Sequence, residues 1–236
     1  MLGKMKILSY NVAGLRACVK KGLREMMLVE DADIICLQET KCPNDILVFD
    51  GYHAQWNVGK VKGYAGIATL SKIKCINSYS CGEGRLMMTE HEDFYLVNVY
   101  VPNSGKSLQN RLDWNQWFMN YLSTLKNKKI IVCGDMNVSH NDIDIYSPKT
   151  LCTKPGFLSQ ERCDFTKLLD DIDLDDLWRL CSGEPGYTFW SYMGGCKGKN
   201  LGRRLDYFLC NATLVYTMNV LDKHLMSDHC PITLTF

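Results

Sequence analysis

Several classes of protein are excluded by what this chain of 236 residues lacks. Its formal net charge at pH 7 is only +1, so any nucleic-acid-binding surface must come from local segregation of Lys and Arg rather than from bulk charge. No run approaches the roughly 18 apolar residues of a membrane-spanning helix. The first residues, MLGKMKILSYNVAG, interrupt a short apolar stretch with polar side chains. We therefore expect no secretory signal peptide and a domain that begins almost at once.

The motifs of several enzyme classes are also missing. The sequence has no P-loop, no G-x-S-x-G nucleophile elbow and no H-E-x-x-H zinc helix. It has twelve cysteines but no C-x-x-C pair, and Cys36, Cys133 and Cys210 each stand inside an apolar run. Since buried cysteine behaves as a small hydrophobic residue, we expect reduced thiols in an intracellular protein, with a structural zinc site as the alternative.

What the chain does contain is a series of short strand-like runs. Most are nearly continuous apolar segments that end in polar residues, as buried strands do. They lie at 6–12, 32–38, 66–72, 94–101, 129–135, 204–210 and 230–236. Helical patterns separate some of them, so the sequence predicts an α/β fold over residues 1–236, a single domain in which helices cover β-sheets.

The clearest helical pattern covers residues 107–127, where aromatic and aliphatic side chains recur with a period near 3.6 and form one apolar stripe. Weaker patterns predict helices at 15–30 and 159–171, the second with Ser159 as its N-cap.

Two long loops are predicted at 139–158 and 182–203, and loops of this length in a compact domain are often functional. The second loop supplies most of an expected basic patch. The cations of this patch are Lys197, Lys199, Arg203 and Arg204, together with Lys60, Lys62 and Lys106.

Polar side chains stand where five of the apolar runs begin or end, which is where α/β folds place their sites. They are Asn11, Glu39, Asp135, Asn137, Asp206, Asp228 and His229. One such residue is usually a turn or cap residue, but a set of seven is harder to attribute to turns. Carboxylates and amides suit a hard cation such as Mg²⁺, and a metal beside one histidine suits hydrolysis of a phosphodiester.

Eight motifs give the chain a resemblance to a known family. SYNVAGLRA, LQETK, NVYVPNSG, GDMNVSH, GFLSQER, YTFWSY, GRRLDYFL and SDHCPIT follow one another as they do in exonuclease III-type AP endonucleases. These enzymes belong to the endonuclease/exonuclease/phosphatase superfamily, and the resemblance runs from about residue 6 to residue 236. LQET, GDxN and SDH indicate only the superfamily, whereas GFLSQER, YVPNSG and RLDYFL are similar to the AP endonuclease branch, above all to the eukaryotic catalytic domain.

The resemblance implies a four-layer α/β sandwich, with two packed mixed β-sheets flanked by helices. It also implies a Mg²⁺-dependent enzyme of base excision repair, with Mn²⁺ as a substitute ion. The expected reaction is hydrolysis of the phosphodiester 5′ to an abasic site in duplex DNA, which leaves a 3′-hydroxyl. We further expect 3′-5′ exonuclease and 3′-phosphodiesterase activities, a monomer, a nuclear location and no membrane association.

The resemblance also implies roles for the polar residues. Glu39 is expected to be the main metal ligand, Asp135 to orient or activate water, and His229 to contact the scissile phosphate. Tyr100 is expected to reach the same phosphate, and Asp206 to hold the histidine ring charged and oriented. The full metal set implied is Asn11, Glu39, Asp135, Asn137, Asp228 and His229.

A further set of residues resembles the family's DNA contacts. Tyr64 and Arg85 are expected at the backbone, Asn103 at a phosphate, and Phe189 and Leu205 around an extruded abasic sugar. The complete set is Tyr64, Arg85, Asn103, Lys106, Phe189, Met193, Arg203 and Leu205. Lys106 stands where the relatives insert an arginine beside the lesion, and Met193 resembles a residue wedged into the duplex.

The chain departs from the family pattern at three positions. Ala13 replaces an aspartate that helps to bind or hydrate the metal, and Ser147 replaces an asparagine facing the DNA. Arg203 replaces a tryptophan of the pocket wall, where a guanidinium would contact phosphate or loosen selectivity for the abasic sugar. Two other functions stay open: a phosphatase acting on inositol phosphates or lipids, and a catalytically weakened DNA-binding or scaffold protein, which only Ala13 favours.

Overall fold

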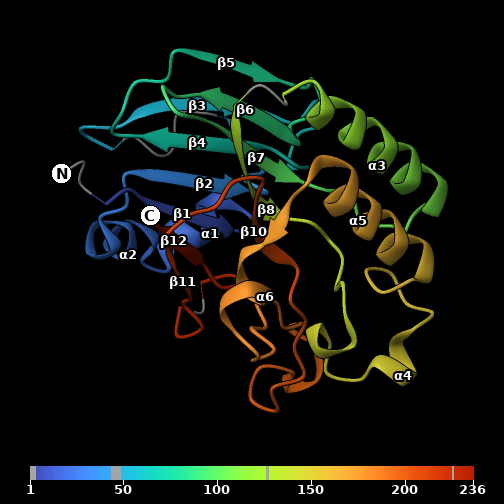
Figure 1. Ribbon diagram of the computed structural model, residues 1–236. Coiled ribbons are helices and arrows are strands. Elements are labelled where there is room, and N and C mark those ends of the chain that lie inside the picture. The colour runs from blue at the N-terminus through green and yellow to red at the C-terminus, as the bar shows by residue number, and fades with distance from the viewer. Residues whose placement is uncertain (1–3, 44–48, 126–127, 225) are drawn as a thin grey trace.

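The computed structural model describes residues 4–43, 49–125, 128–224 and 226–236. Within these residues, twelve strands form two six-stranded β-sheets (Figure 1). The described helices are α1 (Leu15–Lys20), α2 (Leu23–Glu30), α3 (Leu108–Ser123), α4 (Pro148–Leu151), α5 (Ser159–Ile172) and α6 (Leu177–Cys181), with 3₁₀ turns η1 (Asp142–Asp144) and η2 (Met193–Gly195).

Both sheets are mixed. The order in the first is β11 (Thr217–Val220), β12 (Ile232–Thr235), β1 (Lys6–Asn11), β2 (Ile34–Gln38), β4 (Ile67–Ser71) and β3 (His53–Asn57). The order in the second is β5 (Asn77–Ser80), β6 (Leu86–Glu90), β7 (Phe94–Tyr100), β8 (Lys129–Asp135), β10 (Asp206–Cys210) and β9 (Asp175–Asp176). Among the described strands, β1 pairs with β2 and β7 with β8 in parallel, and the other pairs are antiparallel.

The core has three layers of apolar contact, and these make the fold the four-layer sandwich that the resemblance implies. In β8, Ile131 and Cys133 pack between the two sheets, while Ile130 and Val132 pack against α3 and α5. The alternation follows from the two-residue period of a strand. On the other side, β1 and β2 pack in the same way against α1 and α2. Because both faces of these strands are covered, they are apolar nearly throughout.

Two amides connect the sheets within this apolar interface. Gln38 Nε2, at the end of β2, donates to Asn98 Oδ1 on β7 at 2.8 Å, and Asn98 Nδ2 donates to the carbonyl of Ala68 at 2.9 Å. Both amides are buried. Since a buried amide is costly without partners, these bonds restrict how one sheet sits against the other.

The strand predictions hold for the buried strands and miss the others. The pattern does not reveal β3, β5, β6, β9 or β11, because these strands are very short or only partly buried, and β5 is exposed along its length. The single helix expected at 15–30 is wrong. Two helices meet there at Gly22, whose φ of +99° is a left-handed conformation that glycine adopts most readily.

The other two helix predictions need smaller corrections. The helix expected at 107–127 is observed as α3, and Ser107 caps it by accepting from the N–H of Asn110 at 3.2 Å; residues 126–127 lie outside the described part. Ser159 is not an N-cap but the first residue of α5. Leu158 precedes it, and its N–H donates to Glu161 Oε2 at 3.0 Å.

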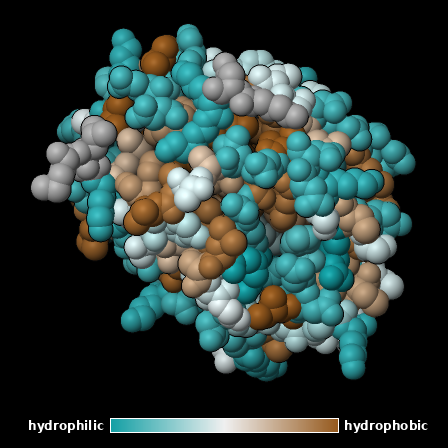
Figure 2. Space-filling view, in the orientation of Figure 1, coloured by the Kyte–Doolittle hydropathy of each residue, from teal (hydrophilic) through white to brown (hydrophobic). Residues whose placement is uncertain are grey.

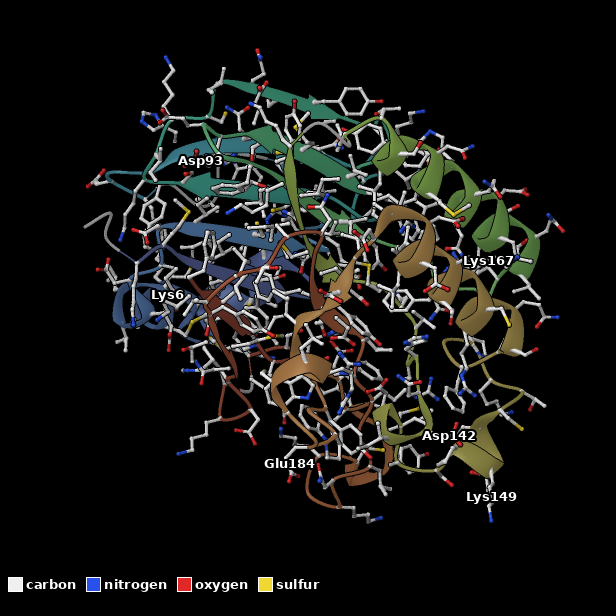
Figure 3. The ribbon with its side chains drawn as sticks, viewed as in Figure 1. Lys6, Asp93, Asp142, Lys149, Lys167 and Glu184 are labelled. Carbon is white, nitrogen blue, oxygen red and sulfur yellow. The ribbon has the colours of Figure 1, made fainter. Side chains whose placement is uncertain are left out.

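The two predicted long loops lie against each other at one end of the molecule. Ile145 pairs with Arg203, and the N–H of Tyr146 donates to the carbonyl of Gly202 at 3.1 Å. Figure 3 labels Asp142 and Lys149 at this end, away from Lys6 and Asp93. The loops contain η1, α4 and η2, so they are not wholly irregular.

The cysteines that stand inside apolar runs of the sequence are buried in the structure. Cys36, Cys133 and Cys210 are buried thiols, and no disulfide joins any of the twelve cysteines, all of which are described. Figure 2 shows hydrophobic side chains interspersed among hydrophilic ones on the visible face. None of the described helices is both long enough and apolar enough to cross a bilayer.

Candidate active site

Strand direction brings the predicted polar residues to one edge of the two sheets. β1 ends at Asn11, and Glu39 directly follows the neighbouring parallel strand β2. β7 and β8 are also parallel, and their register places Tyr100 opposite Asp135. β10 runs the other way and therefore begins at this edge, with Asp206 opposite Asp135. The parallel strands β1, β2, β7 and β8 thus end at this edge of the sheets, and the antiparallel strand β10 begins there.

His229 is held by two carboxylates. Its Nδ1 lies 2.7 Å from Asp206 Oδ2, and its Nε2 lies 3.8 Å from Asp135 Oδ2. Burial alone would lower the pKa of His229, but the charges of Asp206 and Asp135 outweigh it and raise the pKa. The raised pKa favours the protonated ring, in which Nδ1 donates to Asp206. The hydroxyl of Thr188 accepts from the N–H groups of Leu205 and Asp206 at 3.0 and 3.1 Å, which fixes the start of β10.

Asn11 lies between two carboxylates. Its Nδ2 donates to Glu39 Oε1 at 3.0 Å and to Asp135 Oδ2 at 2.8 Å, and its Oδ1 accepts from the N–H of Ala13 at 3.0 Å. The amide nitrogen, not the oxygen, therefore faces the carboxylates. Burial would raise the pKa of Glu39, but hydrogen bonds from Lys41, at 2.7 Å, and from Asn11 lower it overall.

The turn after β8 is held by hydrogen bonds around Asn137, whose φ of +48° is uncommon for a residue other than glycine. Its N–H donates to Asp135 Oδ1 at 2.8 Å, and its Nδ2 donates to the carbonyl of Val101 at 2.9 Å. Its Oδ1 accepts from Asn103 Nδ2 at 3.2 Å. Burial raises the pKa of Asp135, and the charges of Asp206 and Glu39 raise it further against the opposing effect of His229.

A cavity of about 570 Å³ opens onto these groups. Its polar lining includes Glu39, Tyr100, Asn103, Asp135, Asn137, Asp228 and His229, and its other lining includes Tyr146, Leu151, Phe189, Leu201, Arg203 and Leu205. Asn11 and Asp206 do not line it but contact residues that do. The structure therefore brings most of the predicted catalytic and metal-binding residues to one cavity.

The carboxylates of this cavity have the chemistry that a hard cation requires. Asp135, Asp206 and His229 each place one potential ligand atom within 4.8 Å of the others. The Nδ1 of His229 already lies 2.7 Å from Asp206 Oδ2, so its Nε2, 3.8 Å from Asp135 Oδ2, is the ring atom left to face an ion or a phosphate. Glu39 and Asp135, with Asp228 in the same lining, offer the oxygen donors that Mg²⁺ prefers. A cation there would offset the charges of Asp206 and Glu39, which add to burial in raising the pKa of Asp135.

The expected DNA-backbone residues surround a second hollow of about 500 Å³, which shares Asn103 with the cavity. Arg85 donates to the hydroxyl of Tyr64 at 2.8 Å and to the carbonyl of Tyr100 at 3.2 Å. Lys106 Nζ lies 5.4 Å from the centre of the Tyr64 ring. Met193 lines neither hollow; it lies in η2 with 80% of its surface exposed.

The predicted basic patch is wrong at Arg204. This side chain is only 1% exposed, and its Nε donates to Asp144 Oδ1 at 2.8 Å. Its two terminal nitrogens donate to the two oxygens of Asp176 at 2.9 and 2.7 Å. Buried arginine is rarely found without such partners, and this one connects the two long loops to β9 rather than contacting solvent.

Sequence reasoning missed Arg111, which is 2% exposed on α3. Its Nη1 donates to the carbonyls of Pro102 and Asn137 at 2.8 and 3.1 Å, and its Nη2 donates to that of Met136 at 2.9 Å. The carboxylate of Glu161 lies 3.9 Å away. Arg111 thus fixes the segments that carry Asn103 and Asn137. A signal was available, because Arg111 is in phase with the apolar stripe of the helix.

The comparisons with known proteins agree with this geometry. Residues 8–229 match the model of the Endonuclease/Exonuclease/phosphatase family. The chain belongs to this family. Members among its relatives include the DNA repair nuclease APEX1 of Danio rerio, 42% identical over 98% of this chain and 81% of that protein, and the exodeoxyribonuclease of Bacillus subtilis, 37% identical over 98% of both.

Recombination repair protein 1 of Drosophila melanogaster is 43% identical over 98% of this chain, but the chain spans only 37% of that protein's length. Among solved structures of the family, the AP endonuclease of Leishmania major superposes with a TM-score of 0.90. It is 29% identical, and the match covers 99% of this chain and 87% of that one. The four-layer fold is thus shared with an AP endonuclease.

Proposed function

We propose that this protein is a Mg²⁺-dependent AP endonuclease that hydrolyses the phosphodiester 5′ to an abasic site in duplex DNA and leaves a 3′-hydroxyl. One observation carries the proposal: the charged Asp206–His229 pair and the Glu39–Asn11–Asp135 bridge meet at a single cavity. The names of two relatives, a DNA repair nuclease and an exodeoxyribonuclease, favour cleavage of DNA over the other reactions of the family. The 3′-5′ exonuclease and 3′-phosphodiesterase reactions need the same groups and belong to the same proposal.

In the proposed reaction the oxygen of water attacks phosphorus and the bond from phosphorus to O3′ breaks. Asp135 accepts a hydrogen bond from this water and takes its proton, because Asn11 and Asn137 hold the carboxylate in place. His229 donates from Nε2 to a phosphate oxygen and Tyr100 donates its hydroxyl, so both stabilise the charge that develops there.

The Mg²⁺ ion, for which Mn²⁺ is the substitute, supplies positive charge to the phosphate. Glu39 would hold it, with Asp135 and Asp228 nearby. Asn11 and Asn137 fit this set less well than the resemblance implies. The nitrogen of Asn11 faces the carboxylates, and the oxygen of Asn137 already accepts from Asn103. We therefore assign both amides to holding the carboxylates rather than to binding the ion.

The remaining assignments concern the DNA and the setting. Tyr64, Arg85 and Lys106 would contact the backbone beside the cavity, where they lie together. Phe189 and Leu205 would contact the extruded sugar, and the exposed Met193 would enter the duplex. We propose that residues 1–236 act as one monomeric domain in the nucleus, where the substrate is held.

The test is incision of a duplex with one tetrahydrofuran abasic analogue, in Mg²⁺ and separately in EDTA, with an intact duplex as control. Incision only 5′ to the analogue and only with the metal supports the proposal. The Glu39→Gln variant should need a higher Mg²⁺ concentration, whereas Lys167→Gln, at an exposed position of α5 labelled in Figure 3, should match the unchanged protein. No incision at any Mg²⁺ or Mn²⁺ concentration would overturn the proposal.

A further inference from the structure

Arg203 brings a positive charge into the cavity beside the catalytic histidine. Its backbone exchanges two hydrogen bonds of 2.9 Å with Phe189, and Phe189 in turn pairs with His229. The three residues are therefore neighbours across a short ladder, with Phe189 in the middle. Since adjacent strands lie about 4.8 Å apart, the backbones of Arg203 and His229 are separated by roughly 10 Å. All three side chains line the cavity.

The guanidinium is held in this position but has few partners. Its Nη1 donates to the carbonyl of Pro155 at 2.8 Å, and within the described residues this is the only hydrogen bond of the side chain. A guanidinium has five N–H donors, so most of them stay available. No carboxylate of the described part lies within ion-pair distance of it, unlike neighbouring Arg204. Burial lowers the pKa of Arg203, and the opposing effects of Tyr146 and Glu161 do not cancel this.

The surroundings of the guanidinium favour anionic groups of a substrate over neutral ones. The cavity lining that Arg203 shares includes Leu151, Leu201 and Leu205, whose side chains offer no acceptor for its donors. A neutral sugar ring would offer it only weak acceptors, whereas a carboxylate or phosphate would form charge-assisted hydrogen bonds with the planar fork.

We propose that Arg203 determines substrate preference, and that the cavity favours phosphodiesters whose group beyond the scissile phosphate is itself anionic, such as a 3′-phosphoglycolate end. The inference rests on the proposed function and specifies its substrate class. With the scissile phosphate beside His229, we place the substituent beyond it in the part of the cavity that Arg203 also lines. The volume of about 570 Å³ has room for it.

The reaction on such an end is the hydrolysis described above. The water oxygen bonds to phosphorus, the bond from phosphorus to O3′ breaks, and O3′ leaves with the electron pair and takes up a proton. The carboxylate stays on the released phosphoglycolate and is unchanged, so Arg203 binds the leaving fragment without taking part in bond breaking.

The test compares two nicked duplexes that differ in one charge, a 3′-phosphoglycolate end and its neutral 3′-phosphoglycolamide. For each variant the ratio of kcat/KM for the two ends is measured. Charge-assisted hydrogen bonds are worth about 1.5–3 kcal/mol, so Arg203→Gln should lower this ratio by about 10- to 150-fold. Gln keeps a donor for the carbonyl of Pro155, and melting curves check that the variant folds. Arg203→Lys keeps the charge but loses the planar fork, so its kcat/KM ratio should lie between those of the unchanged protein and Arg203→Gln.

Lys154→Gln is the matched control, because Lys154 is an exposed cation in the lining of the same cavity. It should leave the ratio unchanged. A ratio that is unchanged in Arg203→Gln, or that falls in Lys154→Gln instead, would overturn the assignment. Equilibrium binding of both ends in EDTA separates this inference from the proposed function. If neither end is cleaved, the proposed function fails, and the binding ratio of the same variants still decides whether Arg203 selects the anion.

Discussion

Replacing Arg111 with methionine should remove the support of the catalytic turns. The guanidinium is almost fully buried and donates to the carbonyls of Pro102, Met136 and Asn137. Glu161, which is wholly buried, has this guanidinium 3.9 Å away and an oxygen with no hydrogen-bond partner. The substitution therefore leaves three carbonyls without their charged donor and one carboxylate without its nearby cation. Methionine fills a similar length of side chain, so the loss is mainly electrostatic.

The size of the effect follows from the free-energy cost of leaving one charge of a buried ion pair without its partner. Removing one partner typically costs about 3–5 kcal/mol. In proteins of about 150–250 residues, 1 kcal/mol shifts Tm by about 2–4 °C, so Tm should fall by roughly 6–20 °C. Activity should fall as well, because Arg111 holds both the turn in which Asn137 donates to Asp135 and the segment that carries Asn103.

Thermal and urea unfolding of Arg111→Met measure the loss, and Arg111→Met/Glu161→Gln tests its cause. The double variant removes the unpaired negative charge and should recover about 1 kcal/mol or more of the lost free energy of unfolding. Lys167→Met, an exposed site on α5, is the control and should change stability by less than about 0.5 kcal/mol. If Arg111→Met lowers Tm by less than about 3 °C, or if the double variant is less stable than the single one, the reasoning is refuted.

Three other changes have expected outcomes. Glu39→Ala and Asp135→Ala should each lower the single-turnover incision rate by at least about 10²-fold, the scale for loss of a key electrostatic group, and a cellular role that survives both would favour a scaffold protein. Burial lowers the pKa of His91, so the folded state favours the neutral ring; its stabilising effect is present above the unfolded pKa, near 6.5, and is lost as pH falls. Urea unfolding at pH 7.5 and 5.5 should therefore show a smaller acid-induced loss for His91→Phe than for the unchanged protein. Log affinity for duplex DNA should fall linearly with log salt, and Lys106→Gln should reduce that slope by about 1 in a fluorescence titration; a flat salt response would contradict the proposed surface.

The sequence predicts the parts of the fold that are buried on both sides. β1, β2, β7 and β8 are nearly continuous apolar runs because sheet and helix cover their two faces, and such runs are visible without a structure. The strands at and near the sheet edges are not visible in this way. β5 is exposed in every residue, so packing against its neighbour, rather than its own pattern, makes it a strand.

The location of the site follows from the same strands, whereas its detailed contacts do not. A polar residue after each buried strand is a local signal, and parallel pairing of β1 with β2 and β7 with β8 then brings the strand ends together. The direction in which Asn11 turns its amide depends on the N–H of Ala13, and the partners of Arg111 come from two distant segments. Such contacts exist only in three dimensions, so residue type alone implied a ligand in one case and nothing in the other.

The adjacent residues Arg203 and Arg204 have different surroundings although the sequence predicts that both belong to one basic patch. In an extended chain, neighbouring side chains point to opposite sides, so Arg203 and Leu205 line the cavity while Arg204 and Asp206 are buried behind it. Grouping Arg203 and Arg204 into one basic patch ignores this alternation. Once Leu205 is placed in the cavity, the same two-residue period assigns Arg203 to the substrate and Arg204 to the core. The basic patch therefore has fewer cations for the DNA backbone than the sequence suggests. Of the two arginines that it loses, Arg203 lies in the cavity, where we propose that it determines substrate preference.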